Sequence, residues 1–152
     1  MTQEMGQFQG LMNTTIINKG QMAWTELLTN KDSILSIYSN TPPSLTSVEL
    51  HKVCLDRDGP QLDIYFDLAS FPEFPPKKWH LKEYNSVQVH LVLIDLQSVL
   101  LSGWTDTSYI IDIDVQRSCG NINFSIANST LIINCVAKFM TIANLSAYCK
   151  RN

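Results

Sequence analysis

The alternating pattern of residues 61–69 constrains the fold of this chain more than any other feature. Apolar and polar side chains follow one another there without a break, and the apolar set is Leu62, Ile64, Phe66 and Leu68. A period of two is typical of a β-strand that buries one face. The preceding residues, 56–60, read Asp-Arg-Asp-Gly-Pro, and these residue types form tight turns. We therefore expect a β-hairpin within residues 42–79.

The first strand of this hairpin changes phase once. Its apolar residues fall into two parities, Val48 with Leu50 and Val53 with Leu55. All four can share one face only if an extra residue at His51-Lys52 forms a β-bulge. The sequence therefore predicts a bulge at that point.

The segment after the hairpin contains three prolines between Phe71 and Trp79. Proline disfavours helix, so the pattern predicts an extended segment that crosses the sheet. We expect its aromatic residues to cover an open edge of the core and Trp79 to be largely buried.

The rest of the chain reads mainly as strands. Alternation predicts strands at 86–93, 109–116, 121–127 and 130–137, with Asn128-Ser129 as a two-residue hairpin loop. Residues 98–101 either extend the first of these or follow a bend at Asp95. The last segment, 138–148, fits strand and helix about equally, and we favour strand.

Helices are expected only near the N-terminus. A first short helix carries Trp24, and a second, capped by Asn30 or Asp32, stops at the prolines that begin at Pro42. Residues 1–20 show no clean period and are interpreted as a poorly ordered tail, which leaves residues 21–152 as a single domain.

These elements predict a mainly β fold of the α+β type. We expect an antiparallel sheet of about six to eight strands, curved or two-layered, with one or two short N-terminal helices. The chain has 152 residues, 45% of them hydrophobic, which is enough for one well-filled core and too few to favour two.

Charge and hydropathy exclude several classes of function. The formal net charge is -3, without a run of Lys or Arg, so we expect no nucleic-acid binding. No apolar run approaches the length of a membrane helix, and the start lacks the pattern of a signal peptide. We therefore expect a cytoplasmic protein that does not bind membranes. The four cysteines lack metal-site spacing, and we expect them to be buried free thiols.

A catalytic or metal site is not evident in the sequence. The three histidines, His51, His80 and His90, lie in different elements. Asp112 and Asp114 share one face of a strand, as two ligands of a cation would, but a solvated strand face explains them better. We therefore expect no enzyme activity, no cofactor and no metal.

A series of short motifs between Trp24 and Tyr148 resembles a known family. The motifs are Pro-Pro-Ser-Leu (42–45), Val-Glu-Leu (48–50), Leu-Asp-Arg-Asp-Gly-Pro (55–60), Phe-Asp-Leu (66–68), Pro-Pro-Lys-Lys-Trp (75–79), Val-Gln-Val (87–89), Gly-Trp (103–104) and a closing Ala-Tyr (147–148). In this order they resemble the immunity protein 50 family of bacterial polymorphic toxin systems. The resemblance implies a cytosolic protein that binds a cognate toxin domain and blocks it. The motif residues look like determinants of fold and identify no contact residue.

Candidate toxin-binding residues come from the charge pattern. Between Lys82 and Arg117 the chain has no basic residue, and further carboxylates occur in the predicted hairpin. An acidic face can steer and hold a basic toxin, although a polar surface that contacts only water explains the same pattern. The candidates are Asp56, Asp58, Asp63, Asp67, Trp104, Asp106, Asp112 and Asp114. A carbohydrate-binding module that uses Trp104 and a self-associating assembly subunit remain alternatives, and the oligomeric state is left open.

Overall fold

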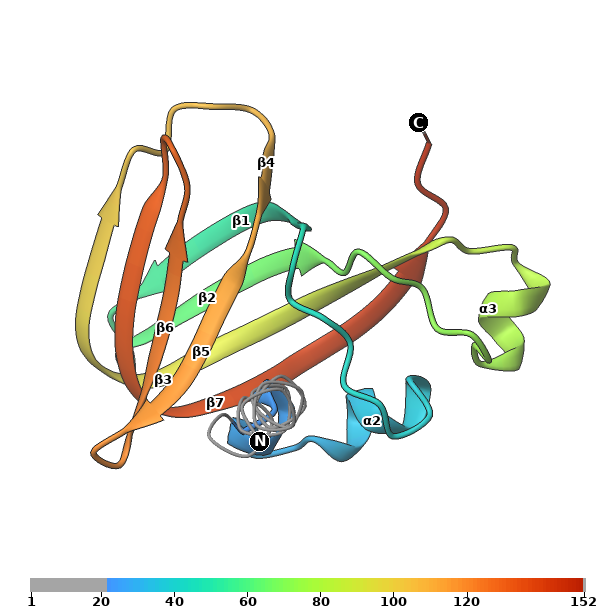
Figure 1. Cartoon of the computed structure of the whole chain (residues 1–152), viewed down its shortest axis with the longest axis horizontal. Coiled ribbons are helices and arrows are strands. Elements are labelled where there is room, and N and C mark those ends of the chain that lie inside the picture. The colour runs from blue at the N-terminus through green and yellow to red at the C-terminus, as the bar shows by residue number, and fades with distance from the viewer. Residues whose placement is uncertain (1–21, 152) are drawn as a thin grey trace, which may run out of the picture.

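The computed structural model describes residues 22–151 and shows a strongly curled antiparallel sheet of seven strands flanked by short helices (Figure 1). This confirms the predicted mainly β fold. The elements are η1 (Trp24–Leu27), α2 (Asp32–Ile37), β1 (Val48–Asp56), β2 (Gln61–Asp67), α3 (Lys77–Leu81), β3 (Ser86–Ser102), β4 (Tyr109–Ile111), β5 (Ile113–Ser118), β6 (Asn121–Ala127) and β7 (Ile132–Tyr148).

The predicted hairpin is formed by β1 and β2. Its apolar face points into the core, where Leu62, Ile64 and Phe66 are buried. The predicted bulge is also confirmed, because the register passes from Leu50 opposite Phe66 to Lys52 opposite Tyr65. The extra residue returns Val53 and Leu55 to the core side, where they face Ile64 and Leu62.

The two longest strands, β3 and β7, pair along their whole length and carry the curl of the sheet. β3 shifts register between Leu96 and Ser98, next to Asp95, whose φ is 59°. Residues 98–101 therefore extend this strand, which was one of the two predicted alternatives, and the strand assignment of the last segment is confirmed. β7 begins at Ile132 instead of residue 130, because the turn spans residues 128–131.

The sheet curls until its two ends meet. The strand order is β4-β1-β2-β3-β7-β6-β5, and only Asp112 separates β4 from β5 in the chain. One continuous segment thus pairs with β1 through its first half and with β6 through its second. The inward side chains of this segment are buried, as the alternation predicted; they are Tyr109, Ile111, Ile113 and Val115.

The N-terminal elements pack against β7. Leu28 forms a bridge with Met140, and both side chains are buried. The predicted caps of α2 are wrong: the residue before the helix is Lys31, and no side chain caps it. Asn30 instead pairs its amide with the backbone of Ile142, at 2.7 Å to the carbonyl and 3.0 Å from the N–H. The helix also ends at Ile37, before the prolines. The interpretation of residues 1–20 lies outside the described residues.

The extended crossing segment is only partly as predicted. Pro76 is followed by the short helix α3, which contains Trp79. Proline is excluded from the interior of a helix but is well tolerated just before its first turn, so the five residues after Pro76 are free to be helical. Trp79 is half-buried and packs against Phe71 with ring centroids 6.2 Å apart, whereas Phe74 is exposed. Trp79 was expected to be largely buried; it packs against the core but is only partly buried.

The four cysteines are free, but they differ in exposure. Only Cys135 is buried; Cys54 is half-buried, and Cys119 and Cys149 are exposed. The predicted burial therefore holds for Cys135 alone.

None of the helices within residues 22–151 is long and apolar enough to cross a bilayer.

Candidate functional site

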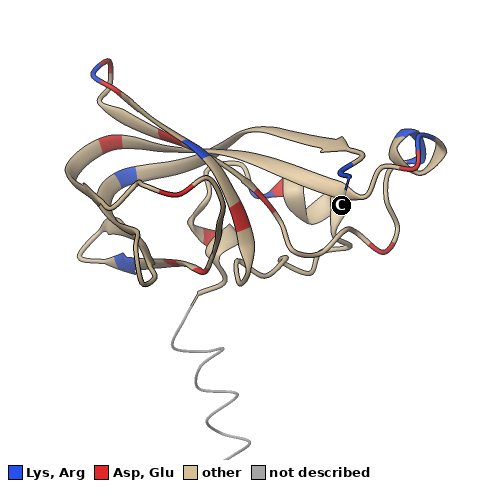
Figure 2. Ribbon diagram, turned by 90° about the horizontal axis from the view of Figure 1, so that it is seen from above, with Lys and Arg blue, Asp and Glu red and all other residues tan. Residues whose placement is uncertain are grey.

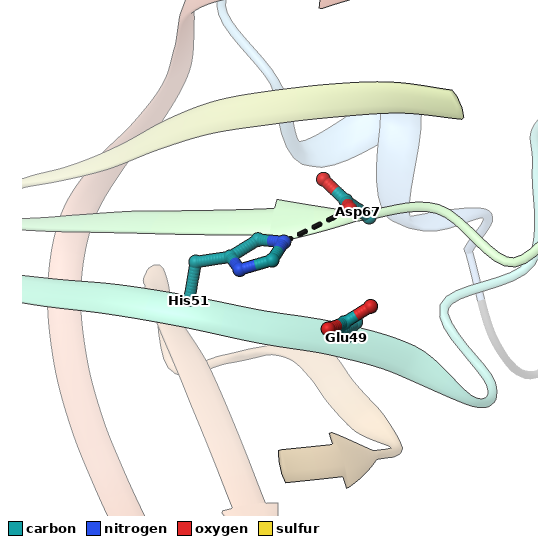
Figure 3. Close-up of side chains that lie close together, drawn as sticks. All are labelled: Glu49, His51 and Asp67. Atoms are coloured by element: carbon teal, nitrogen blue, oxygen red, sulfur yellow. Dashed lines mark ion pairs between the residues drawn. The ribbon is translucent and has the colours of Figure 1, made fainter. Parts of the chain in front are cut away.

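Five polar residues meet on the outer side of the sheet, and we refer to them as the ionic cluster: Glu49, His51, Asp67, Tyr148 and Lys150. Asp67 lies at its centre with only 2% of its surface exposed. Its Oδ2 atom is 2.9 Å from His51 Nε2 and 3.3 Å from Lys150 Nζ, and it accepts a hydrogen bond from the Tyr148 hydroxyl. Figure 3 shows the side chains of Glu49, His51 and Asp67 converging from β1 and β2.

The bulge and the C-terminal residues assemble this cluster. Glu49 lies opposite Asp67 in the ladder, and the bulge at His51 directs the imidazole toward the same carboxylate. Lys150 follows β7 and is fixed by Asn85, whose side chain hydrogen-bonds to the Lys150 backbone N–H at 2.7 Å and carbonyl at 3.0 Å. The Lys150 ammonium then contacts both Glu49 and Asp67.

The cluster has the ligand types of a cation site, but it already contains a cation. One ligand atom each from Glu49, His51 and Asp67 lie within 4.8 Å of one another. Such a set can hold a divalent ion. Here the Lys150 ammonium lies between the carboxylates, and it offsets the cost of burying Asp67. The geometry therefore favours a structural ion-pair network over a metal centre.

The electrostatics of the cluster keep Tyr148 protonated. Burial, the hydrogen bond to Asp67 and the charge of that carboxylate together raise the pKa of Tyr148 to about 12. The phenol therefore acts as a hydrogen-bond donor at neutral pH. Together with His51 and Lys150, it contacts the Oδ2 atom of Asp67.

A second polar group extends the outer face along β2 and β3. Asp63 Oδ2 is 2.7 Å from His90 Nε2, and the His90 ring stacks on Tyr65 with centroids 4.1 Å apart. Lys52 Nζ lies 4.9 Å from the centre of the Tyr65 ring. This part of the surface presents acids and bases together, so Asp63 and Asp67 do not act there as bare negative charges.

The other predicted acidic residues are dispersed. Asp56 ends β1 and Asp58 lies in the hairpin turn; both are exposed, and Asp56 accepts a hydrogen bond from the Asp58 N–H at 2.9 Å. Asp106 lies in the loop between β3 and β4, and its carboxylate is 3.3 Å from the Thr130 hydroxyl. Asp112 and Asp114 are exposed on either side of Ile113. Figure 2 shows acidic positions over several parts of the molecule, with basic positions among them.

Trp104 belongs to the same loop as Asp106. Its ring packs on Tyr109 with centroids 5.0 Å apart, and 39% of its surface is exposed. The Tyr109 hydroxyl in turn accepts hydrogen bonds from the backbone N–H groups of Thr105 and Asp106. Trp104 therefore forms part of an ordered loop and presents only one portion of its ring to solvent.

A groove lies between the end of the hairpin and the second half of β3. It has a volume of about 450 Å³ and is lined by Leu55, Asp56, Arg57, Pro60, Leu96, Gln97, Ser98 and Val99. We refer to it as the hairpin groove. Leu55 is 66% exposed, although it occupies a core-facing position of its strand. The groove therefore combines an exposed apolar side chain with a charged rim.

Comparison with known proteins identifies the family. The model of the family described as Immunity protein 50 matches residues 30–148, which is more than half of the chain. The chain belongs to the immunity protein 50 family. The matched region of this immunity protein 50 member includes all seven strands, so the family covers the sheet and both polar groups described above except Lys150. No curated protein and no solved structure is significantly similar to the chain.

Sequence reasoning overlooked the ionic cluster. It treated each histidine separately and did not consider Glu49, Tyr148 or Lys150 as members of a site. A signal was available in the predicted bulge, because an extra residue at His51 brings that side chain onto the hairpin face that carries Asp67. The contribution of Lys150 had no signal, since its position depends on β7 pairing with β3.

Proposed function

We propose that this protein is a cytosolic immunity protein that binds a cognate bacterial toxin and neutralises it. The observation that carries the proposal is the family match over residues 30–148. Among the described residues, the buried carboxylate of Asp67 is held in place by His51, Tyr148 and Lys150. These contacts fix the outer face of the sheet, which is consistent with a binding role. An outer face that is held rigid in this way can bind another protein. The cognate toxin is the one partner that the proposal requires.

Within this proposal, acidic residues contact a basic surface of the toxin. The structure favours some candidates over others, because Asp63 and Asp67 are engaged by basic side chains and Asp112 by the backbone of Ser47. Within residues 22–151, the exposed candidates that have no basic partner and are not tied to the Ser47 backbone are Asp56, Asp58, Asp106 and Asp114. These carboxylates can accelerate association with a basic partner through long-range attraction.

Co-expression tests the proposal. The toxin domain encoded beside this gene should arrest growth when produced alone, and co-production of this protein should restore growth. The purified proteins should form a stable complex of defined stoichiometry on gel filtration. Growth arrest that persists despite abundant folded protein, together with separate elution of the two chains, would contradict the proposal.

Charge reversal tests the acidic residues separately. Asp58→Lys and Asp114→Lys should slow association with the toxin most strongly at low salt, because exposed charges are screened as salt rises. Asp32→Lys, a reversal in the N-terminal helix α2, is the matched control and should leave the rate unchanged. If all three variants associate as fast as wild type, Asp58 and Asp114 do not contribute to association. This result would not contradict the immunity function itself.

Trp104 leaves one alternative to test. A partly exposed tryptophan on a loop can stack on a sugar ring, although its packing on Tyr109 leaves only part of the ring free. A glycan array with wild-type protein and Trp104→Ala distinguishes the two functions. Binding of a glycan by wild-type protein alone, without any effect on the toxin, would favour a carbohydrate-binding module.

A further inference from the structure

The first unpaired strand edge lies on β1. β4 pairs with β1 only from Val48 to Leu50, whereas β2 continues to pair with β1 as far as Asp56. On the side away from β2, residues 52–56 therefore have no strand beside them within residues 22–151. Backbone N–H and C=O groups on such an edge are free to pair with an added strand.

The second unpaired edge lies on β3. β2 pairs with β3 only as far as Ile94. Beyond the bend at Asp95, β3 continues to Ser102 with β7 as its single neighbour among the described strands. Residues 98–102 therefore also present a free edge, on the side from which β2 has diverged.

Both edges border the same opening in the curled sheet. The loop of residues 103–108 runs from the end of β3 to β4, which pairs with β1, so it closes the opening on a third side. The hairpin groove occupies the corner between the hairpin turn and the bend of β3, where the Leu96 N–H bonds to the Pro60 carbonyl at 3.1 Å. In Figure 1 the end of the hairpin lies beside this bend at the left of the molecule.

A row of core residues ends uncovered at this opening. Across the strands, Leu55 faces Leu62, Leu62 faces Leu93, and Leu93 faces Met140. The last three are fully buried, whereas Leu55 is exposed because no strand lies beyond it. Leu96 and Val99 line the groove opposite Leu55 and are only partly buried. An added strand at this position would continue the sheet and complete the core row.

We propose that an extended segment of the toxin adds to this opening as a β-strand, with an apolar side chain over Leu55 and basic residues beside the hairpin turn. The proposal rests on the immunity function proposed above and assigns its docking surface. Unpaired backbone edges select an extended chain over a helix. Asp56 and Arg57 line the groove, and Asp58 and Asp95 are next in sequence to lining residues. Arg57 is the single basic residue of the turn, so the charge of the rim favours a basic partner segment.

Hydrogen exchange locates the docking surface directly. In the free full-length protein, the amides of residues 52–56 and 98–102 that point away from neighbouring strands should exchange quickly. Addition of the toxin domain encoded beside this gene should protect amides in both segments together. Slow exchange in the free protein would mean that another part of the chain or a second copy already covers the edges, and this result would overturn the proposal.

A pair of variants provides the quantitative test. Leu55→Arg should weaken binding of the same toxin domain by about tenfold or more, as expected for an apolar contact at the centre of an interface. Leu81→Arg is the matched control, because Leu81 is 69% exposed but lies on α3, and it should bind within about twofold of wild type. Circular dichroism melting should show that both variants are folded.

A charge-neutral variant tests the rim. Asp56→Asn combined with Asp58→Asn retains an oxygen at position 56 that can accept the turn hydrogen bond, but removes both charges. It should reduce the association rate and its dependence on salt. If wild-type protein does not bind the toxin, the immunity function itself is wrong. If wild type binds and Leu55→Arg binds equally well, only the docking surface assigned here is wrong.

Discussion

The carboxylate of Asp112 accepts a hydrogen bond from the backbone N–H of Ser47 across 2.8 Å. Ser47 immediately precedes β1 and has a positive φ of 56°. Ile113, the residue after Asp112, donates its N–H to the Leu45 carbonyl at 3.0 Å. The point at which β4 passes into β5 is thus attached to the segment that leads into β1. A residue that the alternation places on a solvated strand face therefore also holds the fold together.

This contact predicts unequal effects at two neighbouring carboxylates. Asp112→Ala removes the acceptor of the Ser47 N–H and should lower the free energy of unfolding by about 1 kcal/mol. Asp114→Ala is the control, because among the described residues the Asp114 carboxylate hydrogen-bonds only to the exposed amide of Gln116. It should change stability by less than about 0.5 kcal/mol. Urea denaturation measures both values, and equal midpoints would contradict the structural role of Asp112.

Two glycines with positive φ should respond differently to alanine. At Gly103 an added Cβ would lie 1.7 Å from the Thr130 carbonyl oxygen, so Gly103→Ala must displace backbone and should cost more than about 2 kcal/mol. At Gly120 an added Cβ meets nothing within 4 Å, and only the backbone conformation is unfavourable. Gly120→Ala should cost about 1 kcal/mol. Thermal denaturation of the two variants in parallel provides the comparison, and a smaller loss at position 103 would show that the loop relaxes.

The ionic cluster predicts a late-titrating tyrosine. Ultraviolet titration of the folded protein should show that Tyr148 ionises near its pKa of about 12, above the ordinary value of 10.0. Asp67→Asn should lower the pKa of Tyr148, because the neighbouring negative charge is removed. Tyr148→Phe should remove this step from the titration curve. A Tyr148 pKa that is unchanged by Asp67→Asn would show that the Asp67 carboxylate does not act on the phenol.

The same pKa has a consequence for alkaline stability. Since the folded-state pKa of Tyr148 is raised, its stabilising contribution is complete below about pH 10 and is lost as the pH rises toward about 12. Burial also raises the pKa of the Cys135 thiol to about 12 and raises the pKa of Tyr38 above its ordinary value, so wild-type protein loses stability from all three groups as they ionise. The free energy of unfolding of Tyr148→Phe should therefore decline less steeply between about pH 10 and pH 12.

Thiol labelling should follow burial. Cys119 and Cys149 are exposed and should react first with a thiol reagent, whereas Cys135 should not react in the folded protein because burial keeps its thiol protonated. Denaturation without a reductant should make all four available. Two unreactive thiols under those conditions would indicate a disulfide and would also argue against a cytosolic location.

Local patterns predicted most of the sheet. The alternation at Leu62, Ile64 and Phe66 reports burial of one face, and this signal survives into the structure because both strands of the hairpin are adjacent in sequence. Tertiary contacts decide the elements that were misassigned. Asn30 has the residue type of a helix cap, but its amide finds partners on Ile142, which lies more than a hundred residues away. The prolines before Trp79 predicted an extended segment. The last of them is Pro76, however, and the residues after it form a helix.

The candidate site was less predictable than the fold. The sequence shows where the carboxylates are but not which side chains contact them. Asp63 and Asp67 were therefore predicted to be exposed negative charges, as Asp58 is. Their pairing with His90 and His51 depends on strand register. The periodicity predicts which face of the sheet a side chain occupies, but not which residue of the next strand lies beside it. The two open strand edges are likewise a property of where the ladders stop, at Leu50 and at Ile94, and no residue type marks those positions.

The continuous segment formed by β4 and β5 has a consequence for the order in which the protein folds. Its halves pair with β1 and β6, the strands next to the two opposite ends of the sheet, so the segment as a whole has both partners only after the intervening strands have assembled. Closing such a long-range contact loses chain entropy before it gains packing. We therefore expect this segment to dock after the transition state, with low φ-values at Ile111 and Ile113, and to be the place where the native barrel-like sheet first opens on unfolding.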